Sequence, residues 1–236
     1  MTTAPDFTFA FQPIVNTNDE TIFSCEALIR GLQGEPAQSV FSKIGTANLL
    51  EFDQHARNIA LKIFASLKIN CLLNINCMPG CLETSDKYVL ETLDNVKENG
   101  LLPSQLVIEI TENEIIHDYK KFIERINMLR EHGIKVAIDD FGAGYSGLNL
   151  LVNFQPDMIK LDKELVKNIY SHGPRQVIVK ALIQTCLSLG IDLIAEGVEN
   201  QEEYSWLRKH GLYLFQGFLF AKPGLATLPL VTFPTF

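Results

Sequence analysis

Residues 133–139 read GIKVAID, residues 190–196 read GIDLIAE and residues 211–216 read GLYLFQ. Each stretch begins with glycine, continues as a short run of residues with high β propensity and ends on a polar side chain. Apolar residues at helical spacing precede each glycine, and a glycine just past the last turn is a common way for a helix to end. This recurring order of helix, glycine and strand predicts a βα repeat.

Further segments fit the same plan. Strands are expected at 71–76, 105–110 and 157–161, and helices at 53–67, 86–98 and 162–169. Strands that alternate with helices form a parallel sheet, and both a doubly wound sheet and a (β/α)8 barrel fit this order. The length of 236 residues is close to the ~250 residues that are typical of the barrel. Polar residues at the ends of nearly every strand also favour the barrel, because an open sheet gathers its ligand contacts at one switch point.

The composition is that of a globular chain, with 47% hydrophobic residues. We expect residues 1–236 to form a single domain, because no linker, low-complexity stretch or charge run divides them. The N-terminal sequence lacks the basic and apolar regions of a signal peptide, and no apolar stretch approaches the about 20 residues of a membrane span. These features predict a cytoplasmic chain without membrane insertion.

Cysteine usage and charge limit the kinds of partner. The five cysteines include no CxxC pair and have no histidine close by, which favours buried, reduced thiols over a zinc site. The formal net charge is −8, and the basic residues do not cluster. Proteins that bind polymeric nucleic acid carry the opposite excess of charge, so such a partner is not expected. A small phosphate ligand stays open, because bound divalent cations reverse the local field.

Polar side chains end most of the predicted strands. They are Glu26, Asn76, Glu109, Asp139, Asp140, Glu196 and Gln216, with Lys160 as the one cation of this set. Carboxylates that converge on one barrel mouth repel one another unless cations lie between them, and oxygen ligands favour Mg²⁺ or Mn²⁺ over Zn²⁺. A strand-end aspartate more often forms a turn or a helix cap. The residue types alone leave both roles open.

Eight motifs in the chain resemble, in order, those of the EAL-domain family of bacterial cyclic di-GMP phosphodiesterases. They are FQPIV (11–15), CEALIR (25–30), NINCMP (74–79), EITE (109–112), IDDFGAGYSGL (138–148), DMIKLD (157–162), IAEGVE (194–199) and QGFLFAKP (216–223). The resemblance covers nearly the whole chain. It implies an α/β fold, a modified (β/α)8 TIM-like barrel with one antiparallel strand near the N-terminus. It also implies hydrolysis of cyclic di-GMP to linear pGpG with Mg²⁺ or Mn²⁺, two ions per active site.

The resemblance implies a role for each polar strand-end residue. The family's metal ligands match Glu26, Asn76, Glu109, Asp139, Asp140 and Glu196. Asp139 matches the ligand that bridges both ions, and Glu196 matches a glutamate assigned to the second ion or to general-base duty. Lys160 matches the lysine that holds the attacking water. The substrate-binding positions match Gln12, Arg30 and Gln216.

The segment 141–148 matches a family loop that lies at the dimer interface and is coupled to metal occupancy. Its loop or regulatory residues match Glu112, Phe141, Gly142, Gly144 and Glu199, with the two glutamates as braces. Two positions depart from the family pattern. Gly147 stands where many members have serine, and Met78 stands where a serine commonly follows the metal-binding asparagine by two positions.

These expectations combine into an active, homodimeric cyclic di-GMP phosphodiesterase. One alternative is a catalytically inactive EAL module that binds cyclic di-GMP or a protein partner. Such modules usually lack motif residues, and none is lost here. A second alternative is a barrel phosphodiesterase that acts on glycerol phosphodiesters, and the set of motifs argues against it.

Overall fold

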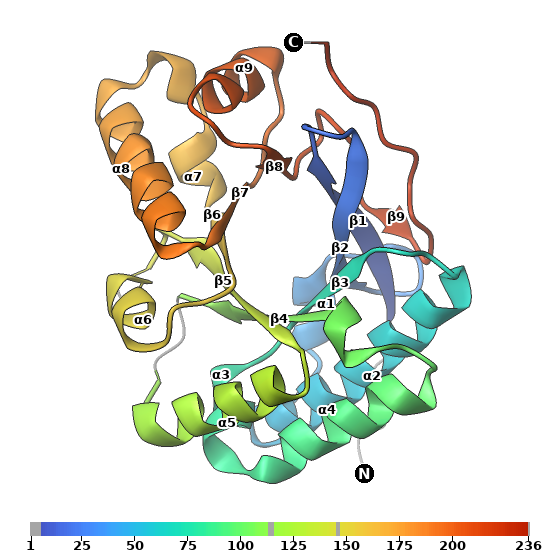
Figure 1. Cartoon of the computed structure of the whole chain (residues 1–236). Helices are drawn as coiled ribbons and strands as arrows, with labels where there is room; N and C mark the ends of the chain where they lie inside the picture. Colours follow the sequence, from blue (N-terminus) through green and yellow to red (C-terminus); the bar gives the residue numbers. More distant parts are fainter. Residues whose placement is uncertain (1–5, 113–115, 145–146, 236) are drawn as a thin grey trace.

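Eight strands close into a barrel in this computed structural model, which describes residues 6–112, 116–144 and 147–235 (Figure 1). The barrel strands are β1 (Thr8–Asn16), β2 (Thr21–Arg30), β3 (Leu72–Asn76), β4 (Leu106–Thr111), β5 (Lys135–Phe141), β6 (Met158–Leu161), β7 (Asp192–Ala195) and β8 (Leu214–Phe215). Neighbours from β2 to β8 are parallel, whereas β1 is antiparallel to both β2 and β8. The predicted modified barrel with one antiparallel strand is confirmed. A short strand, β9 (Gly224–Leu225), pairs with β1.

Helices cover much of the outside of the barrel, and the C-terminal segment runs past β9 on the side of β1 (Figure 1). The helices are α1 (Ala37–Phe41), α2 (Leu49–Leu67), α3 (Pro79–Thr84), α4 (Asp86–Glu98), α5 (Tyr119–Glu131), α6 (Gly147–Phe154), α7 (Lys163–Val166), α8 (Gly173–Leu189) and α9 (Gln201–Lys209). Gly190 ends α8 in the left-handed conformation, with φ of 70°, as its position after the helical pattern predicts. In the described parts of the chain, no helix has the length and apolar composition needed to cross a membrane.

The predicted helix at 162–169 is shorter in the structure. It is α7, which ends at Val166 and is followed by a 3₁₀ turn at Ile169–Ser171. Asn168 interrupts the helix with φ of 54°, and its N–H donates to the Glu203 carboxylate at 2.8 Å. The chain thus turns out of the helix next to a long-range hydrogen bond with α9, and the local pattern did not contain this contact.

Every second side chain of a barrel strand points inward. Successive inward residues of neighbouring strands therefore form layers across the barrel interior, among them an apolar layer and a polar one. The apolar layer consists of Ile14, Val107, Ala137, Met158, Ile194 and Leu214. Two residues farther along the parallel strands, the inward side chains are Glu109, Asp139, Lys160, Glu196 and Gln216. Because β1 runs the opposite way, Gln12 reaches the same end by preceding Ile14. One end of the barrel is therefore packed and apolar, and the other is polar.

Candidate active site

Lys160 lies at the centre of the polar end of the barrel, and its side chain is fully buried. Its Nζ atom is 2.8 Å from Asp139 Oδ1, 2.8 Å from Glu196 Oε1, 2.9 Å from Glu109 Oε1 and 3.2 Å from Glu26 Oε2. The four carboxylates come from β2, β4, β5 and the residue after β7. One ammonium cannot neutralise four carboxylates, so this site holds an excess of negative charge that further cations would stabilise.

Several polar atoms in this cluster are buried without a hydrogen-bond partner among the described residues. They are Lys160 Nζ, Glu109 Oε2, Asp139 Oδ1, Gln216 Oε1 and Asn74 Oδ1. The contacts of Lys160 Nζ are thus close ion pairs that do not meet hydrogen-bond geometry, and its three protons could serve at most three of the four carboxylates. Buried acceptors are nearly always paired in folded proteins. The oxygen atoms left over here fit hard divalent cations.

Two overlapping groups of carboxylates could each hold one cation. Ligand oxygens of Glu26, Glu109 and Asp139 lie within 4.8 Å of one another, and the same holds for Asp139, Asp140 and Glu196. A Mg–O distance of about 2.1 Å brings the ligands of one ion within about 4.2 Å of one another, so small side-chain movements suffice. Asp139 belongs to both groups. The donor set therefore fits two cations that share one aspartate.

The backbone at Asp140 explains how two successive strand residues serve one site. Neighbouring residues of a regular strand point to opposite faces. Here the pairing of β5 with β6 shifts between Ile138 and Phe141, and Asp140 has φ of 52°. This irregularity in the strand gives Asp140 an orientation that regular alternation would not, beside Asp139.

Burial changes the protonation of the site in the absence of a metal. It raises the pKa of Glu109 to about 8, although the nearby Lys160 charge opposes the shift. It also raises the pKa of Asp140 to about 6, with help from the charges of Asp139 and Asp162. Burial lowers the pKa of Lys160, but the surrounding carboxylates outweigh it and hold that pKa well above its ordinary value. Lys160 is therefore a permanent cation in this site.

Asn76 and Asn74 point from β3 toward the carboxylates. Asn76 Nδ2 donates to Glu26 Oε1 at 3.4 Å, and Asn74 Nδ2 donates to Glu109 Oε1 at 2.8 Å. The sequence motifs predicted Asn76 as a site residue but not Asn74. The signal was available, because residues two apart on a strand share a face. Asn74 and Lys160 both contact Glu109 Oε1, so Asn74 helps to fix the orientation of this carboxylate in the cluster.

Two glutamines hold Glu26 from the side of β1 and β8. Gln216 Nε2 donates to Glu26 Oε2 at 2.7 Å and to Gln12 Oε1 at 3.4 Å. Gln12 Nε2 donates to the Ala221 carbonyl at 3.1 Å. Both amide side chains are buried, and together they fix the orientation of the Glu26 carboxylate.

Arg30 stands apart from this cluster, at the end of β2. Its Nη1 donates to the Ile29 carbonyl at 2.7 Å. It lines a cavity of about 590 Å³, which we call the α1 cavity, together with Asn76 and residues of α1 and α2. The cavity walls are largely apolar side chains, so Arg30 offers a charged group beside a space for a ligand with an apolar body.

The turn after β5 is held by Glu112. Glu112 Oε2 accepts hydrogen bonds from Gly142 N at 2.6 Å and Gly144 N at 3.3 Å. Gly142 has φ of 100°, and a Cβ atom there would lie 2.4 Å from Leu165 Cδ1. The backbone conformation at position 142 favours glycine, and a larger residue there would also have to displace the Leu165 side chain of α7.

Other positions singled out in this region lie at its edges. Phe141 is buried at the end of β5. Glu199 is exposed; its N–H donates to Glu203 at 3.1 Å, and its carboxylate makes no hydrogen bond to the described part of the loop. Of the two departures from the family pattern, Gly147 begins α6 and Met78 is the N-cap of α3. Residues 145–146 of the loop lie outside the described residues.

Comparison with known proteins matches residues 2–223 to the model of the EAL domain. Over 227 residues the chain is 37% identical to the "Blue light- and temperature-regulated antirepressor BluF" of Escherichia coli, covering 96% of this chain and 56% of that protein. It is 32% identical over 227 residues to the "Probable cyclic di-GMP phosphodiesterase PdeI" of E. coli, covering 90% of this chain and 28% of that protein. The chain thus spans about half or less of these relatives.

Solved structures of EAL proteins also resemble this chain. A standalone EAL protein of Vibrio cholerae in its c-di-GMP-bound form has a TM-score of 0.93 and 39% identity, with 98% of each chain covered. BlrP1 of Klebsiella pneumoniae, in a manganese and cyclic di-GMP complex, has a TM-score of 0.91 and 40% identity, with 98% of this chain and 59% of that chain covered. With the barrel, the motifs and the family model in agreement, this chain belongs to the EAL-domain family.

Proposed function

We propose that this chain hydrolyses cyclic di-GMP to linear pGpG with two Mg²⁺ or Mn²⁺ ions. The observation that carries the proposal is the pair of carboxylate groups that share Asp139 around the buried Lys160. Glu26, Asn76, Glu109 and Asp139 would hold one ion, and Asp139, Asp140 and Glu196 would hold the other. When bound, such ions make a water molecule more acidic and stabilise charge on the phosphoryl oxygens.

The side chains of the chain itself supply the remaining steps. Glu196 lies at the mouth of the barrel, where its carboxylate accepts the proton of the attacking water. Lys160 places a fixed positive charge beside the phosphoryl group as negative charge develops there. Arg30 holds a phosphate of the substrate through charge-assisted hydrogen bonds. Gln12 and Gln216 keep Glu26 oriented, so that the donor set is organised before substrate arrives.

A second candidate is binding of cyclic di-GMP without hydrolysis. The similarity to an antirepressor favours it, since that protein is named for regulation. Against it, every motif position for metal and nucleophile is filled in this chain. The two functions differ in one product, because only hydrolysis forms pGpG.

Three further properties are part of this proposal. Residues 1–236 would act as a single domain, since one barrel includes the whole candidate site. A homodimer would form through the loop at 141–148 and α6, where Leu148 and Val152 are exposed side chains of 67% and 80% accessibility. A cytoplasmic location would suit the five cysteines, none of which forms a disulfide.

Incubation with cyclic di-GMP tests the function. We expect pGpG with Mg²⁺ or Mn²⁺ and none with a chelator, as resolved by chromatography. The variant Glu196→Gln, which keeps the shape of the side chain, should form no pGpG. Tight binding of cyclic di-GMP without product, in both metals, would instead support the binding module.

A further inference from the structure

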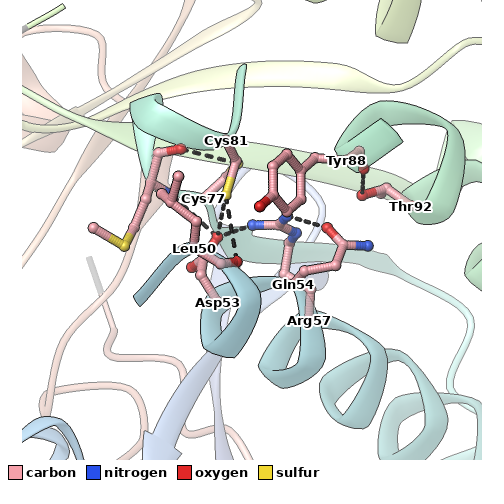
Figure 2. Close-up of polar contacts among 9 residues, drawn as sticks. Leu50, Asp53, Gln54, Arg57, Cys77, Cys81, Tyr88 and Thr92 are labelled. Carbon is pink, nitrogen blue, oxygen red and sulfur yellow. Dashed lines mark hydrogen bonds and ion pairs between the residues drawn. The ribbon is translucent and has the colours of Figure 1, made fainter. Parts of the chain in front are cut away.

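A second group of reactive side chains lies directly behind Asn76. Cys77 follows Asn76 at the end of β3, and Cys81 lies in the first turn of α3. Their Sγ atoms and one carboxylate oxygen of Asp53, from α2, lie within 4.8 Å of one another. Figure 2 shows these side chains between α2 and the segment that joins β3 to α3.

The contacts of Asp53 tie Cys81 and the backbone of Met78 to α2. Cys81 Sγ lies 3.3 Å from Asp53 Oδ2, and the Met78 N–H donates to the same oxygen at 3.4 Å. Arg57 forms a buried ion pair with Asp53 and also bonds Gln54 (Figure 2). Because Arg57 already neutralises Asp53, a divalent cation among these ligands would sit beside a guanidinium. This arrangement favours chemistry between the two thiols over binding of a thiophilic metal.

The two thiols differ in their access to solvent. Cys77 is among the residues that line the α1 cavity, whereas Cys81 is completely buried and is not among them. A cavity of about 590 Å³ admits a molecule as small as hydrogen peroxide. An oxidant that enters this cavity therefore meets Cys77 first, with Cys81 placed to react next.

We propose that Cys77 and Cys81 form a site of reversible oxidation by hydroperoxides. The O–O bond of the peroxide breaks as the Cys77 sulfur takes a hydroxyl group, and the Cys77 proton leaves with the other oxygen as water. Cys81 Sγ then attacks the Cys77 sulfur, and the S–O bond breaks. The second water leaves with the Cys81 proton, for which Asp53 Oδ2 is the neighbouring acceptor. Two thiols lose two electrons, and one hydrogen peroxide becomes two waters.

The disulfide would act on the candidate metal ligands. Its S–S bond is about 2.05 Å long, so the segment 77–81 must close. The Cys77 N–H donates to the Glu109 carbonyl at 2.9 Å, and Asn76 pairs with Glu109 in the sheet. Closure therefore shifts Asn76 relative to Glu109, and metal coordination tolerates only about 0.2 Å of error. This effect on the metal site rests on the proposed function, whereas the disulfide itself does not.

Peroxide treatment of the metal-free chain tests the proposal. We expect the peptide that carries Cys77 and Cys81 to lose about 2 Da, which reducing agent restores. The dissociation constant for Mn²⁺ should rise about tenfold, the scale of an outer-sphere defect at a metal site. Cys81→Ser should form no such disulfide and keep its Mn²⁺ affinity after peroxide. Cys81→Ala replaces this variant if the serine impairs folding.

Cys25 and Cys71 form a second pair of adjacent thiols, and neither lines the α1 cavity. A variant of this pair is therefore the matched control. Cys71→Ser should respond to peroxide as the unmodified chain does. Absence of the Cys77–Cys81 disulfide, or zinc bound by these thiols in the purified chain, would overturn the proposal. A disulfide that leaves Mn²⁺ affinity unchanged would overturn the coupling to Asn76. If the disulfide forms and Mn²⁺ binding weakens but no pGpG is ever made, the proposed hydrolysis fails and this site stands.

Discussion

Lys160 Nζ and Glu196 Oε1 lie 2.8 Å apart at the centre of the barrel mouth. The parallel pairing of β6 with β7 sets this contact, since Lys160 pairs with Ile194 and Glu196 lies two residues beyond it. A fixed positive charge is thereby held next to the carboxylate that we assign to proton transfer. The Lys160 charge thus has two roles: it stabilises the buried carboxylates of the metal-free site, and it lies beside the proposed proton acceptor.

Lys160→Met should separate these two contributions. The methionine keeps most of the volume but leaves the carboxylates without their cation, so turnover should fall about a hundredfold or more. In chelator, the free energy of unfolding should fall by about 3–5 kcal/mol, as for other broken buried ion pairs. Product chromatography and denaturant unfolding measure the two effects. Lys167→Met removes an exposed lysine and is the control; equal effects from both variants would contradict the central role of Lys160.

Asp139→Asn and Asp140→Asn should differ in how many ions they bind. Asp139 belongs to both carboxylate groups, whereas Asp140 belongs to one. We expect Asp140→Asn to retain one Mn²⁺ ion per chain and Asp139→Asn to weaken both. Calorimetric titration with Mn²⁺ counts the ions. The same stoichiometry and affinity in both variants would show that Asp139 is not shared.

Mg²⁺ should bind more tightly as the pH rises from about 6 to about 8. The pKa is raised to about 6 for Asp140 and to about 8 for Glu109, so protons compete with the cation below these values. A raised carboxylate pKa also means that the folded chain binds its proton more tightly than the unfolded chain. The protonated Glu109 carboxyl therefore contributes to the free energy of unfolding. This contribution is complete below its ordinary pKa of 4.5 and is lost as the pH rises through about 8.

Melting curves and calorimetry at several pH values measure both effects. In chelator, the melting temperature should fall over this pH range, and saturating Mg²⁺ should remove most of that fall. Lys160 does not titrate in the window, because its pKa lies above 10.5. Mg²⁺ affinity that stays constant from pH 6 to pH 8 would mean that no carboxylate proton is displaced.

Gly142→Ala should destabilise the chain more than Gly211→Ala does. The two glycines have similar φ values, 100° and 98°. A Cβ at 142 meets Leu165 Cδ1 at 2.4 Å, whereas a Cβ at 211 meets no atom of the described residues within 4 Å. The backbone cost is common to both, and overpacking should add about 1–3 kcal/mol at 142. Denaturant unfolding gives the difference. The added change Leu165→Ala should recover most of it, and a failure to do so would place the cost in the backbone alone.

Much of the site could be predicted because strand alternation is local. Glu109, Asp139, Glu196 and Gln216 follow apolar residues by two positions, so a barrel with the right strands brings them together. The antiparallel direction of β1 came only from the family resemblance, because nothing in the spacing of β1 and β2 sets it. The left-handed Asp140 likewise depends on how β5 meets β6.

Long-range contacts account for what the sequence did not predict. Period two places Asn74 on the same face as Asn76, but its hydrogen bond to Glu109 depends on the pairing of β3 with β4. The sequence predicted Cys77 and Cys81 only as buried, reduced thiols, and it did not show that α2 brings Asp53 against Cys81. Such contacts depend on closure of the barrel, and a pattern of period two or 3.6 carries no information about them.

The most direct measurement is to determine bound Mn²⁺ and pGpG formation in the same samples, with cyclic di-GMP and increasing Mn²⁺. We expect pGpG to appear as the chain takes up two ions, to vanish in chelator, and to be absent in Glu196→Gln, which lacks both the proton acceptor and a carboxylate of the second ion's group. Full pGpG formation in chelator, or two bound ions with no pGpG under any condition, would contradict a two-ion hydrolytic site at Lys160.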